Sequence, residues 1–319
     1  MIVSASYRTD IPAFYGDWFR RRLAAGFCQV VNPYGGPPST VALTPEAVDG
    51  FIFWTRNAAP FAGALVEVAR RRIPFAVQYT ITGYPRALEP SVTNAKQSVA
   101  TLRTLADRYG RRACVWRYDP VLLTSLTPPA WHRETFAHLA AALAGAVDEV
   151  VLSFAQVYAK TARNTARAAA QHGFTWEDPA PEVKRTLLAD LAAIATDHGL
   201  VPTLCAQPDL LASDLAPAPS LTPAPSLTPA RCIDAARLAD VAGRPIAAKT
   251  KGNRPGCQCA ESRDIGAYDS CPHGCVYCYA VRTPAAAKHA YRGHDPAAAA
   301  LAPAFSRARP TRAADKKLR

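Results

Sequence analysis

Short apolar runs alternate with longer amphipathic stretches from the start of the chain to about Leu204. This alternation is typical of βα units, in which helices cover a parallel sheet. The apolar runs predict seven strands: Ile2 to Ser6, Phe27 to Val31, Phe51 to Trp54, Phe75 to Ile81, Ala113 to Trp116, Val150 to Phe154, and Leu200 to Leu204. The stretches between them predict helices: Phe14 to Ala25, Ala59 to Arg72, Val92 to Tyr109, Trp131 to Ala144, Thr161 to His172, and Pro181 to His198. We therefore expect an α/β fold, a complete or partial TIM-like (βα) barrel rather than an open doubly wound sheet.

A proline-rich repeat follows the predicted barrel, which we assign to residues 1–210. The stretch Ala218 to Pro223 recurs at once as Ala224 to Pro229. Because proline removes backbone donors and blocks helix, residues 211–230 are expected to form a linker or a surface insertion. Residues 231–302 are expected to form a cysteine-rich segment that packs on the barrel, with a helix at Arg231 to Ala242. Residues 303–319 are expected to be a disordered basic tail.

The composition suits a protein with a sizeable core, since 49% of the 319 residues are hydrophobic and 19% are charged. Charged residues come too early for a signal peptide, and no later run is long enough to span a bilayer. We therefore expect a cytoplasmic protein with no membrane contact. In a reducing compartment, nine cysteines at uneven spacing favour metal or cluster ligation over disulfides.

The net charge of +12 is concentrated toward the end of the chain. After Phe305, one acid, Asp315, is outnumbered by six bases: Arg307, Arg309, Arg312, Lys316, Lys317 and Arg319. Such a stretch is either a solvated tail or a nucleic-acid contact, and charge alone does not identify a partner.

Five cysteines lie between Cys257 and Cys278, and the last three read Cys271-Pro-His-Gly-Cys275-Val-Tyr-Cys278. Three thiolates on a short loop can hold three irons of a four-iron, four-sulfur (4Fe-4S) cluster and leave the fourth iron free. Gly274 supplies the positive φ that such a loop needs. The alternative is a zinc site that takes His273 or an upstream cysteine as its fourth ligand.

A second set of cysteines comprises Cys205, Cys232, Cys257 and Cys259. The four could form a closed site, either a second iron-sulfur cluster or structural zinc. Alternatively, Cys205 and Cys232 are ordinary buried residues. Two further cysteines, Cys28 and Cys114, lie in predicted strands and are expected in the core.

Polar groups follow three predicted strands, where core packing does not require them. They are Arg8 and Asp10, then Arg56, then Arg117 and Asp119. In a barrel such positions gather on the face that carries the active site, and arginine suits carboxylates and phosphates. The alternative is a ring of Arg-Asp pairs that locks the barrel mouth. Comparable positions are expected for Gln78, Thr80 and Ser153, whereas three histidines are expected at the surface: His132, His138 and His172.

The cysteine motif resembles that of the radical S-adenosylmethionine superfamily, which usually has an aromatic residue before the last cysteine, here Tyr277. The resemblance implies that Cys271, Cys275 and Cys278 bind a 4Fe-4S cluster whose open iron chelates S-adenosyl-L-methionine. It also implies that Tyr277 packs on the adenosyl group and that a flavodoxin or ferredoxin supplies electrons. The run from Cys275 to Ala280 is similar to the motif of spore photoproduct lyase.

A second resemblance spans Met1 to about Tyr279. Four segments are similar to the signatures of an uncharacterised bacterial domain-of-unknown-function family with a C-terminal radical-type cysteine cluster: Arg8 to Pro12, Phe53 to Asn57, Trp116 to Pro120, and Arg263 to Gly266. The cluster loop of a radical enzyme usually follows the first strand. Here it follows at least seven predicted elements, so the order is permuted and only the cysteines and Tyr277 carry over.

Three functions remain open at this point. A radical enzyme with an unknown substrate predicts reductive formation of 5'-deoxyadenosine. A zinc- or iron-sulfur-stapled binding protein, with nucleic acid as one candidate partner, predicts steep salt dependence and indifference to reductant. A simple electron carrier would need a fully ligated cluster.

Overall fold

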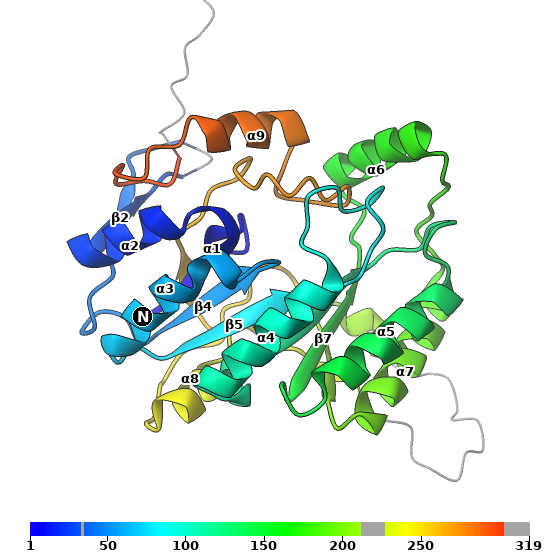
Figure 1. Ribbon diagram of the computed structural model, residues 1–319, viewed down its shortest axis with the longest axis horizontal. Helices are drawn as coiled ribbons and strands as arrows, with labels where there is room; N and C mark the ends of the chain where they lie inside the picture. The colour runs from blue at the N-terminus through cyan, green and yellow to red at the C-terminus, as the bar shows by residue number, and fades with distance from the viewer. Residues whose placement is uncertain (33–34, 212–226, 303–319) are drawn as a thin grey trace, which may run out of the picture.

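The computed structural model describes residues 1–32, 35–211 and 227–302. Its centre is an eight-stranded sheet in the order β10-β1-β4-β5-β6-β7-β8-β9, in which every pairing is parallel (Figure 1). The strands are β1 (Ile2–Ala5), β4 (Gly50–Thr55), β5 (Phe75–Thr80), β6 (Cys114–Val121), β7 (Glu149–Phe154), β8 (Val201–Leu204), β9 (Thr228–Pro229) and β10 (Ser262–Asp264). The predicted parallel α/β fold is confirmed. Within the described residues β9 and β10 each pair with one neighbour, so the sheet has two free edges there.

Helices connect the consecutive strands. They are α1 (Ile11–Phe14), α2 (Gly16–Ala25), α3 (Ala62–Arg70), α4 (Ala95–Tyr109), α5 (Pro129–Leu143), α6 (Ala159–His172), α7 (Pro181–Asp197), α8 (Ala235–Ala242) and α9 (Pro284–Arg292). Short 3₁₀ turns occur at Ala59–Phe61, Arg111–Ala113 and Pro208–Leu210. Local chemistry sets the ends of α4, because the Asn94 side chain accepts a hydrogen bond from Gln97 N and Gly110 follows the last turn.

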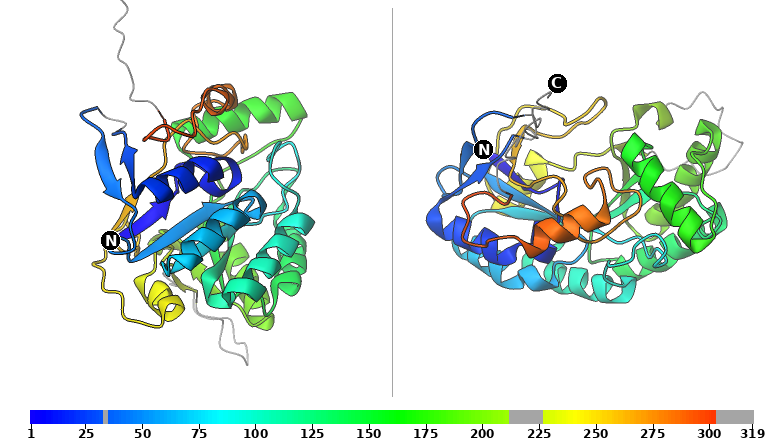
Figure 2. Two further views of the ribbon diagram at one scale, coloured as in Figure 1. Left: turned by 60° about the vertical axis from the view of Figure 1, so that its left-hand side comes forward. Right: turned by 90° about the horizontal axis from the view of Figure 1, so that it is seen from above.

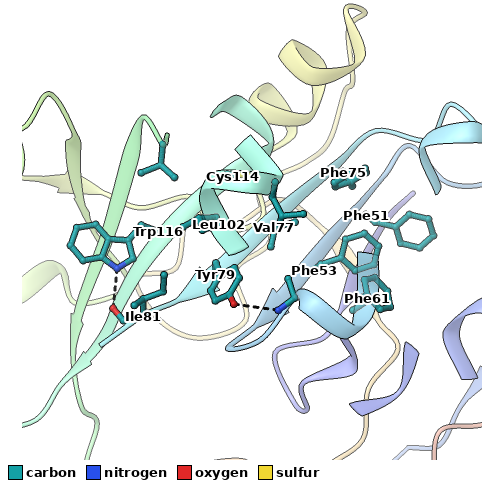
Figure 3. Close-up of a cluster of buried hydrophobic side chains, with 14 of the residues drawn as sticks. Phe51, Phe53, Phe61, Phe75, Val77, Tyr79, Ile81, Leu102, Cys114 and Trp116 are labelled. Atoms are coloured by element: carbon teal, nitrogen blue, oxygen red, sulfur yellow. Dashed lines mark hydrogen bonds between the residues drawn. The ribbon is translucent and has the colours of Figure 1, made fainter. Parts of the chain in front are cut away.

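One face of the sheet packs against the helices and forms the main core (Figure 3). Alternate strand residues point to this face, among them Phe51, Phe53, Val77 and Tyr79. Polar atoms within this core are paired: Trp116 Nε1, for example, donates to the Ile81 carbonyl at 2.9 Å. The clean alternation explains why the strands of this sheet were predictable from the sequence.

The other face of the sheet packs against the chain that follows β8. Ile2, Ile52, Ala76, Val115 and Val151 point to this face and form a second apolar cluster with residues of the C-terminal segment: Ala230, Cys232, Ile233, Leu238, Cys259 and Ala260. Seen from above, the first two thirds of the chain follow an arc, and the yellow segment that follows β8 lies on its inner side (Figure 2). We call this side of the sheet the inner face.

Three predictions about the first two hundred residues need correction. The run at Phe27 forms strand β2 (Phe27–Val30), but it pairs with β3 (Ser39–Ala42) in a separate antiparallel hairpin and takes no part in the parallel sheet. The predicted helix from Phe14 is two helices, α1 and α2, which meet at Tyr15. His132 is fully buried rather than exposed, and it bonds to Tyr118 Oη at 2.8 Å and to the Leu122 carbonyl at 3.2 Å.

Most of the proposed linker and all of the proposed basic tail lie outside the described residues. The described part of the linker includes β9, which adds a parallel strand beside β8. The strand β10 and the helix α9 had no counterpart among the sequence-based expectations. Over the described residues, no helix is long and apolar enough to cross a membrane.

Candidate functional site

Polar side chains continue the inner face beyond its apolar cluster, toward the carboxyl ends of the strands. Arg117 follows Val115 by two positions on β6 and therefore points to the same side. Its Nη1 lies 3.3 Å from Gln78 Oε1, and its Nη2 donates to Asp119 Oδ2. The other carboxylate oxygen of Asp119 accepts from Ser153 Oγ. The structure therefore brings together the groups that were predicted at the ends of separate strands.

Arg56 forms a second buried network above this row. Its Nη1 lies 2.6 Å from Glu89 Oε1, and its Nη2 lies 2.6 Å from Tyr277 Oη. The Tyr277 hydroxyl and Thr82 Oγ1 both donate to the same Glu89 oxygen. Burial by itself lowers the pKa of Arg56, but Glu89 and the other nearby groups raise this pKa well above its ordinary value. Arg56 is therefore a permanent cation with its main partner inside the protein.

Glu89 is a site residue that the sequence did not reveal. It lies in the loop between β5 and α4, where no motif marks it. Glu89 is 4% exposed. Its partners are Arg56, which follows β4, and Tyr277, which belongs to the cysteine loop. Tyr277 is likewise buried, with its ring 5.9 Å from that of Tyr84. That Tyr277 packs on an adenosyl group stays a prediction.

Asp10 ties the start of the chain to the cysteine loop. One carboxylate oxygen accepts from Ala13 N and caps α1, and the other accepts from Arg56 N at 2.7 Å. The second oxygen also lies 2.8 Å from His273 Nε2, and His273 Nδ1 lies 3.4 Å from the Ser91 carbonyl. Because both ring nitrogens of His273 have partners, this geometry argues against His273 as the fourth ligand of a zinc site.

Arg8 differs from the other two strand-end arginines in its partners. Its Nε lies 3.4 Å from Asp264 Oδ1, yet this buried atom makes no hydrogen bond. The carboxylate of Asp264 is already occupied: it accepts from Ser4 Oγ, Ser6 Oγ, Tyr7 N and Gly266 N. Arg8 Nε therefore has no acceptor among the described residues, whereas Arg56 and Arg117 donate to the carboxylates of Glu89 and Asp119.

The stretch Arg263 to Gly266 has a structural function that spacing alone did not reveal. Asp264, on β10, accepts a hydrogen bond from Ser4 Oγ on one carboxylate oxygen and from Ser6 Oγ on the other, and these bonds hold β10 beside β1. A Cβ atom on Gly266 would lie 2.0 Å from Ser6 Oγ, so only glycine fits there. Burial raises the pKa of Asp264, although Arg8 and these donors lower it.

The loop of Cys271, Cys275 and Cys278 is fixed by backbone contacts to neighbouring loops. Val276 N donates to the Leu88 carbonyl at 3.1 Å, and Ser91 N donates to the His273 carbonyl at 3.2 Å. Gly274 has a φ of +77°, as predicted. The loop therefore has a defined shape before any cofactor is added.

The three thiols of this loop are free, partly buried and close enough to influence one another. Burial raises the pKa of Cys271 most, and negative charge on Asp10, Cys278 and Cys275 raises it further. Burial likewise raises the pKa of Cys275, to about 12, and Glu89 and Cys278 add to this effect while Arg56 opposes it. Thiols that affect one another in this way face a common region, which suits a shared cofactor.

In the part of the chain that the structure describes, no three or more His, Cys, Asp or Glu side chains stand at the spacing of a single metal-ion site. Thiolates on one zinc ion all lie about 2.3 Å from it and so crowd together. Thiolates of a 4Fe-4S cluster bind different irons and stand further apart. The same holds for Cys205, Cys232, Cys257 and Cys259, so this finding does not distinguish zinc from a cluster at either cysteine set.

Cys205, Cys232, Cys257 and Cys259 also come together, although up to 54 residues separate them in the sequence (259 − 205). The Cys232 and Cys205 sulfur atoms are 3.5 Å apart, and Cys259 forms hydrogen bonds with both Cys232 and Cys257. Cys205 and Cys232 therefore contact each other, and both also lie in or against the apolar cluster of the inner face, so a shared ligand and ordinary burial both remain open for them. The other two cysteines, Cys28 and Cys114, are fully buried in the main core as predicted.

Aromatic and cationic side chains surround the exposed side of the cysteine loop, and no motif had marked them. Tyr279 is 44% exposed, and its hydroxyl donates to the Tyr7 carbonyl. Arg8 and Lys160 lie 5.5 Å and 5.6 Å from the centre of the Tyr268 ring. The Tyr268 ring is half-buried. Cations held against tyrosine rings can bind anionic groups, so this side of the loop is suited to a charged ligand.

A comparison with known families agrees with this architecture. Residues 2–280 match the family model described as Domain of unknown function (DUF1848). No curated protein matches the chain. Because the match covers nearly every residue from β1 to the cysteine loop, the protein belongs to the DUF1848 family.

Proposed function

We propose that the protein is a radical S-adenosylmethionine enzyme whose cofactor is a 4Fe-4S cluster bound by Cys271, Cys275 and Cys278. The observation that carries this proposal is that, within the described residues, the fourth ligands considered from the sequence are engaged elsewhere. His273 is bonded to Asp10 and Ser91, and the four cysteines of the second set bond to one another. A cluster held by three thiolates keeps one iron available for an outside molecule.

Cys271, Cys275 and Cys278 would hold the cluster, which together with S-adenosylmethionine would supply one-electron chemistry that removes a hydrogen atom from a substrate. A flavodoxin or ferredoxin is the expected electron donor. The protein's own contribution is to hold the loop and to balance charge. Burial raises the pKa of the Cys275 thiol to about 12, and Arg56 opposes this rise, so its charge would help to stabilise the thiolate that iron requires.

Arg8 is the arginine best placed to bind the carboxylate of S-adenosylmethionine or of an anionic substrate. Its Nε lacks a hydrogen-bond partner, whereas Arg56 and Arg117 are bonded to Glu89 and Asp119. We therefore assign to Arg8 alone the anion-binding function that the sequence suggested for three arginines. Asp10 and Asp119 act as positioning residues, because their carboxylates are engaged by neighbouring protein groups.

The test is formation of 5'-deoxyadenosine by anaerobic protein reconstituted with iron and sulfide, given S-adenosylmethionine and dithionite. We expect the product with the wild-type chain and with Cys28→Ala, which removes a distant core thiol. We expect none with Cys271→Ala. Equal amounts from wild type and Cys271→Ala would overturn the proposal and would leave a metal-stapled binding protein as the better interpretation.

A further inference from the structure

The second set of cysteines lies on the inner face, where three separate segments meet. Cys205 follows β8, Cys232 follows β9, and Cys257 and Cys259 belong to the loop before β10. Their contacts form a continuous chain from Cys205 through Cys232 and Cys259 to Cys257. Four thiols from distant positions converge in this way when a common ligand selects them, because packing alone gives no reason for sulfur at all four.

Nitrogen donors of the protein point at three of these sulfur atoms. Arg117 Nη1 lies 2.9 Å from Cys232 Sγ, and Ile233 N lies 3.3 Å from Cys259 Sγ. Arg254 Nη2 lies 3.6 Å from Cys205 Sγ. Two of the three donors are cations, and Arg117 is only 3% exposed. Donors of this kind favour thiolates over neutral thiols. The hydrogen bond with Cys232 and burial nevertheless raise the pKa of Cys205 well above its ordinary value, and Arg117 opposes them.

The spacing of two of the sulfur atoms suits a single ion. Two thiolates on one tetrahedral zinc, each about 2.3 Å from the metal, stand about 3.8 Å apart. The Cys205 and Cys232 sulfur atoms are 3.5 Å apart, in direct hydrogen-bond contact, and so need to move little to bind the same ion. Thiolates on different irons of a cluster would be further apart, since each binds its own metal atom.

We propose that Cys205, Cys232, Cys257 and Cys259 bind one zinc ion as a structural four-thiolate centre. In the described chain the thiols bond directly to one another and do not yet surround a central point. Binding of one zinc ion would release the four thiol protons and move the sulfur atoms apart by a few tenths of an ångström. Arg117 and Arg254 would compensate for the excess negative charge of four thiolates on a dication.

The centre would join the end of β8 to the C-terminal segment, which carries the Cys271 loop. The loop before β10 is shaped for this contact: a Cβ on Gly252 would lie 2.3 Å from the Cys257 carbonyl oxygen. Gly256 has a φ of +74°, which favours glycine. Zinc would therefore fix the segment that positions the first set of cysteines. This proposal does not depend on the radical chemistry of that first set.

The experiment measures zinc and iron per chain in three anaerobically purified proteins. Wild type is expected to hold about one zinc in addition to iron. The triple variant Cys271→Ala, Cys275→Ala, Cys278→Ala is expected to lose iron and keep its zinc. The double variant Cys257→Ala, Cys259→Ala is expected to lose zinc. The proposal is overturned if zinc is absent from wild type, if it disappears with the triple variant, or if the double variant loses iron instead.

The double variant could fail to fold, so a second measurement uses the wild-type protein. X-ray absorption at the zinc edge is expected to show four sulfur neighbours at about 2.3 Å. Nitrogen or oxygen neighbours, or fewer than four sulfurs, would contradict the assignment. If the wild-type protein shows this zinc spectrum but forms no 5'-deoxyadenosine, the proposed radical function fails and the zinc proposal stands.

Discussion

The two cysteine sets of this protein differ in how the chain assembles them and in which charges surround them. Cys271, Cys275 and Cys278 share one short loop, and two of the nearby groups, Asp10 and Glu89, are carboxylates. Cys205, Cys232, Cys257 and Cys259 come from separate segments beside Arg117 and Arg254. The first set has three thiols and an exposed side, and the second has four thiols and a cationic wall. The difference shows that one chain can group cysteines within a single loop and also bring them together from segments that only the fold joins.

The largest effect on stability is expected from Arg117→Ala, which removes a donor from the second set. Arg117 is buried and bonds to Asp119 and Cys232. Its loss leaves a partly buried carboxylate without its cation, which costs about 3–5 kcal/mol. Chemical denaturation measures the change in the free energy of unfolding. The matched control is Arg112→Ala, whose side chain is 39% exposed in its pairs with Asp148 and Asp240, and which should cost at most about 1 kcal/mol.

If Arg117→Ala were no more costly than Arg112→Ala, the cationic wall would have no structural function. The contrast between the two cysteine sets would then be one of sequence spacing only. If instead the variant is destabilised and also loses zinc, the wall and the four-thiolate centre form one unit.

Acid is expected to destabilise the protein through His132, a fully buried residue of α5 whose ring contacts Tyr84. Burial lowers the pKa of His132 to about 4, from an ordinary value of 6.5. The unfolded chain therefore binds the proton more readily than the folded chain. The stabilisation is complete above pH 6.5 and is lost as the pH falls toward about 4, by about 3 kcal/mol in all.

The measurement is the free energy of unfolding between pH 7 and pH 4 for wild type and for His132→Gln. Between pH 7 and pH 4 the free energy of unfolding should fall by about 3 kcal/mol less in the variant than in wild type, because glutamine does not titrate. The exposed His138→Gln serves as the control and should follow wild type. Since the His132 ring contacts Tyr84, whose ring contacts Tyr277, amide exchange should rise in the Cys271 loop before it rises near Cys232. The reverse order would contradict this placement.

Sequence reasoning predicted the central strands of the parallel sheet because short apolar runs, such as Phe51 to Trp54, alternate with amphipathic stretches along the chain. It misassigned Phe27 because a hairpin strand and a sheet strand have the same local composition. The grouping of Cys271, Cys275 and Cys278 was predictable because they lie within one loop, and their binding of a cluster stays a prediction. The second cysteine set was predictable only as a list of residues, because the contact between Cys205 and Cys232 depends on the fold.

Other site residues carried no sequence signal at all. Glu89 lies in an unremarkable loop, and its pairing with Arg56 depends on how β4 and the cysteine loop meet. His132 was misjudged for a related reason: a histidine on an amphipathic helix is usually exposed, and only the packing of α5 on β6 shows that this one is buried. Partners that are distant in sequence are the common cause of these failures.

A smaller effect is expected from Tyr277→Phe, which tests how firmly the first set is held. The substitution keeps the ring and removes a hydroxyl that bonds to Arg56 and Glu89. Hydrogen bonds to charged groups contribute about 2 kcal/mol, so the free energy of unfolding should fall by about that amount. Tyr291→Phe, at an exposed position, should leave stability unchanged. A loss of zinc with Tyr277→Phe would contradict the independence of the two sets.

The smallest effect on stability is expected from Gly274→Ala, and its comparison with Gly252→Ala separates the two loops. Gly274 has a φ of +77°, and an added Cβ would meet only Pro90 Cγ at 3.4 Å. The cost is therefore the conformational one, about 1–2 kcal/mol, and iron binding should persist. At Gly252 an added Cβ would lie 2.3 Å from the Cys257 carbonyl oxygen, so the backbone itself must move and zinc should be lost. Iron and zinc per chain, measured beside thermal unfolding, test both expectations. The opposite result would be that Gly252→Ala keeps its zinc while Gly274→Ala loses its iron. The loop around Cys257 would then be the more tolerant of the two, and the assignment of a rigid structural centre there would fail.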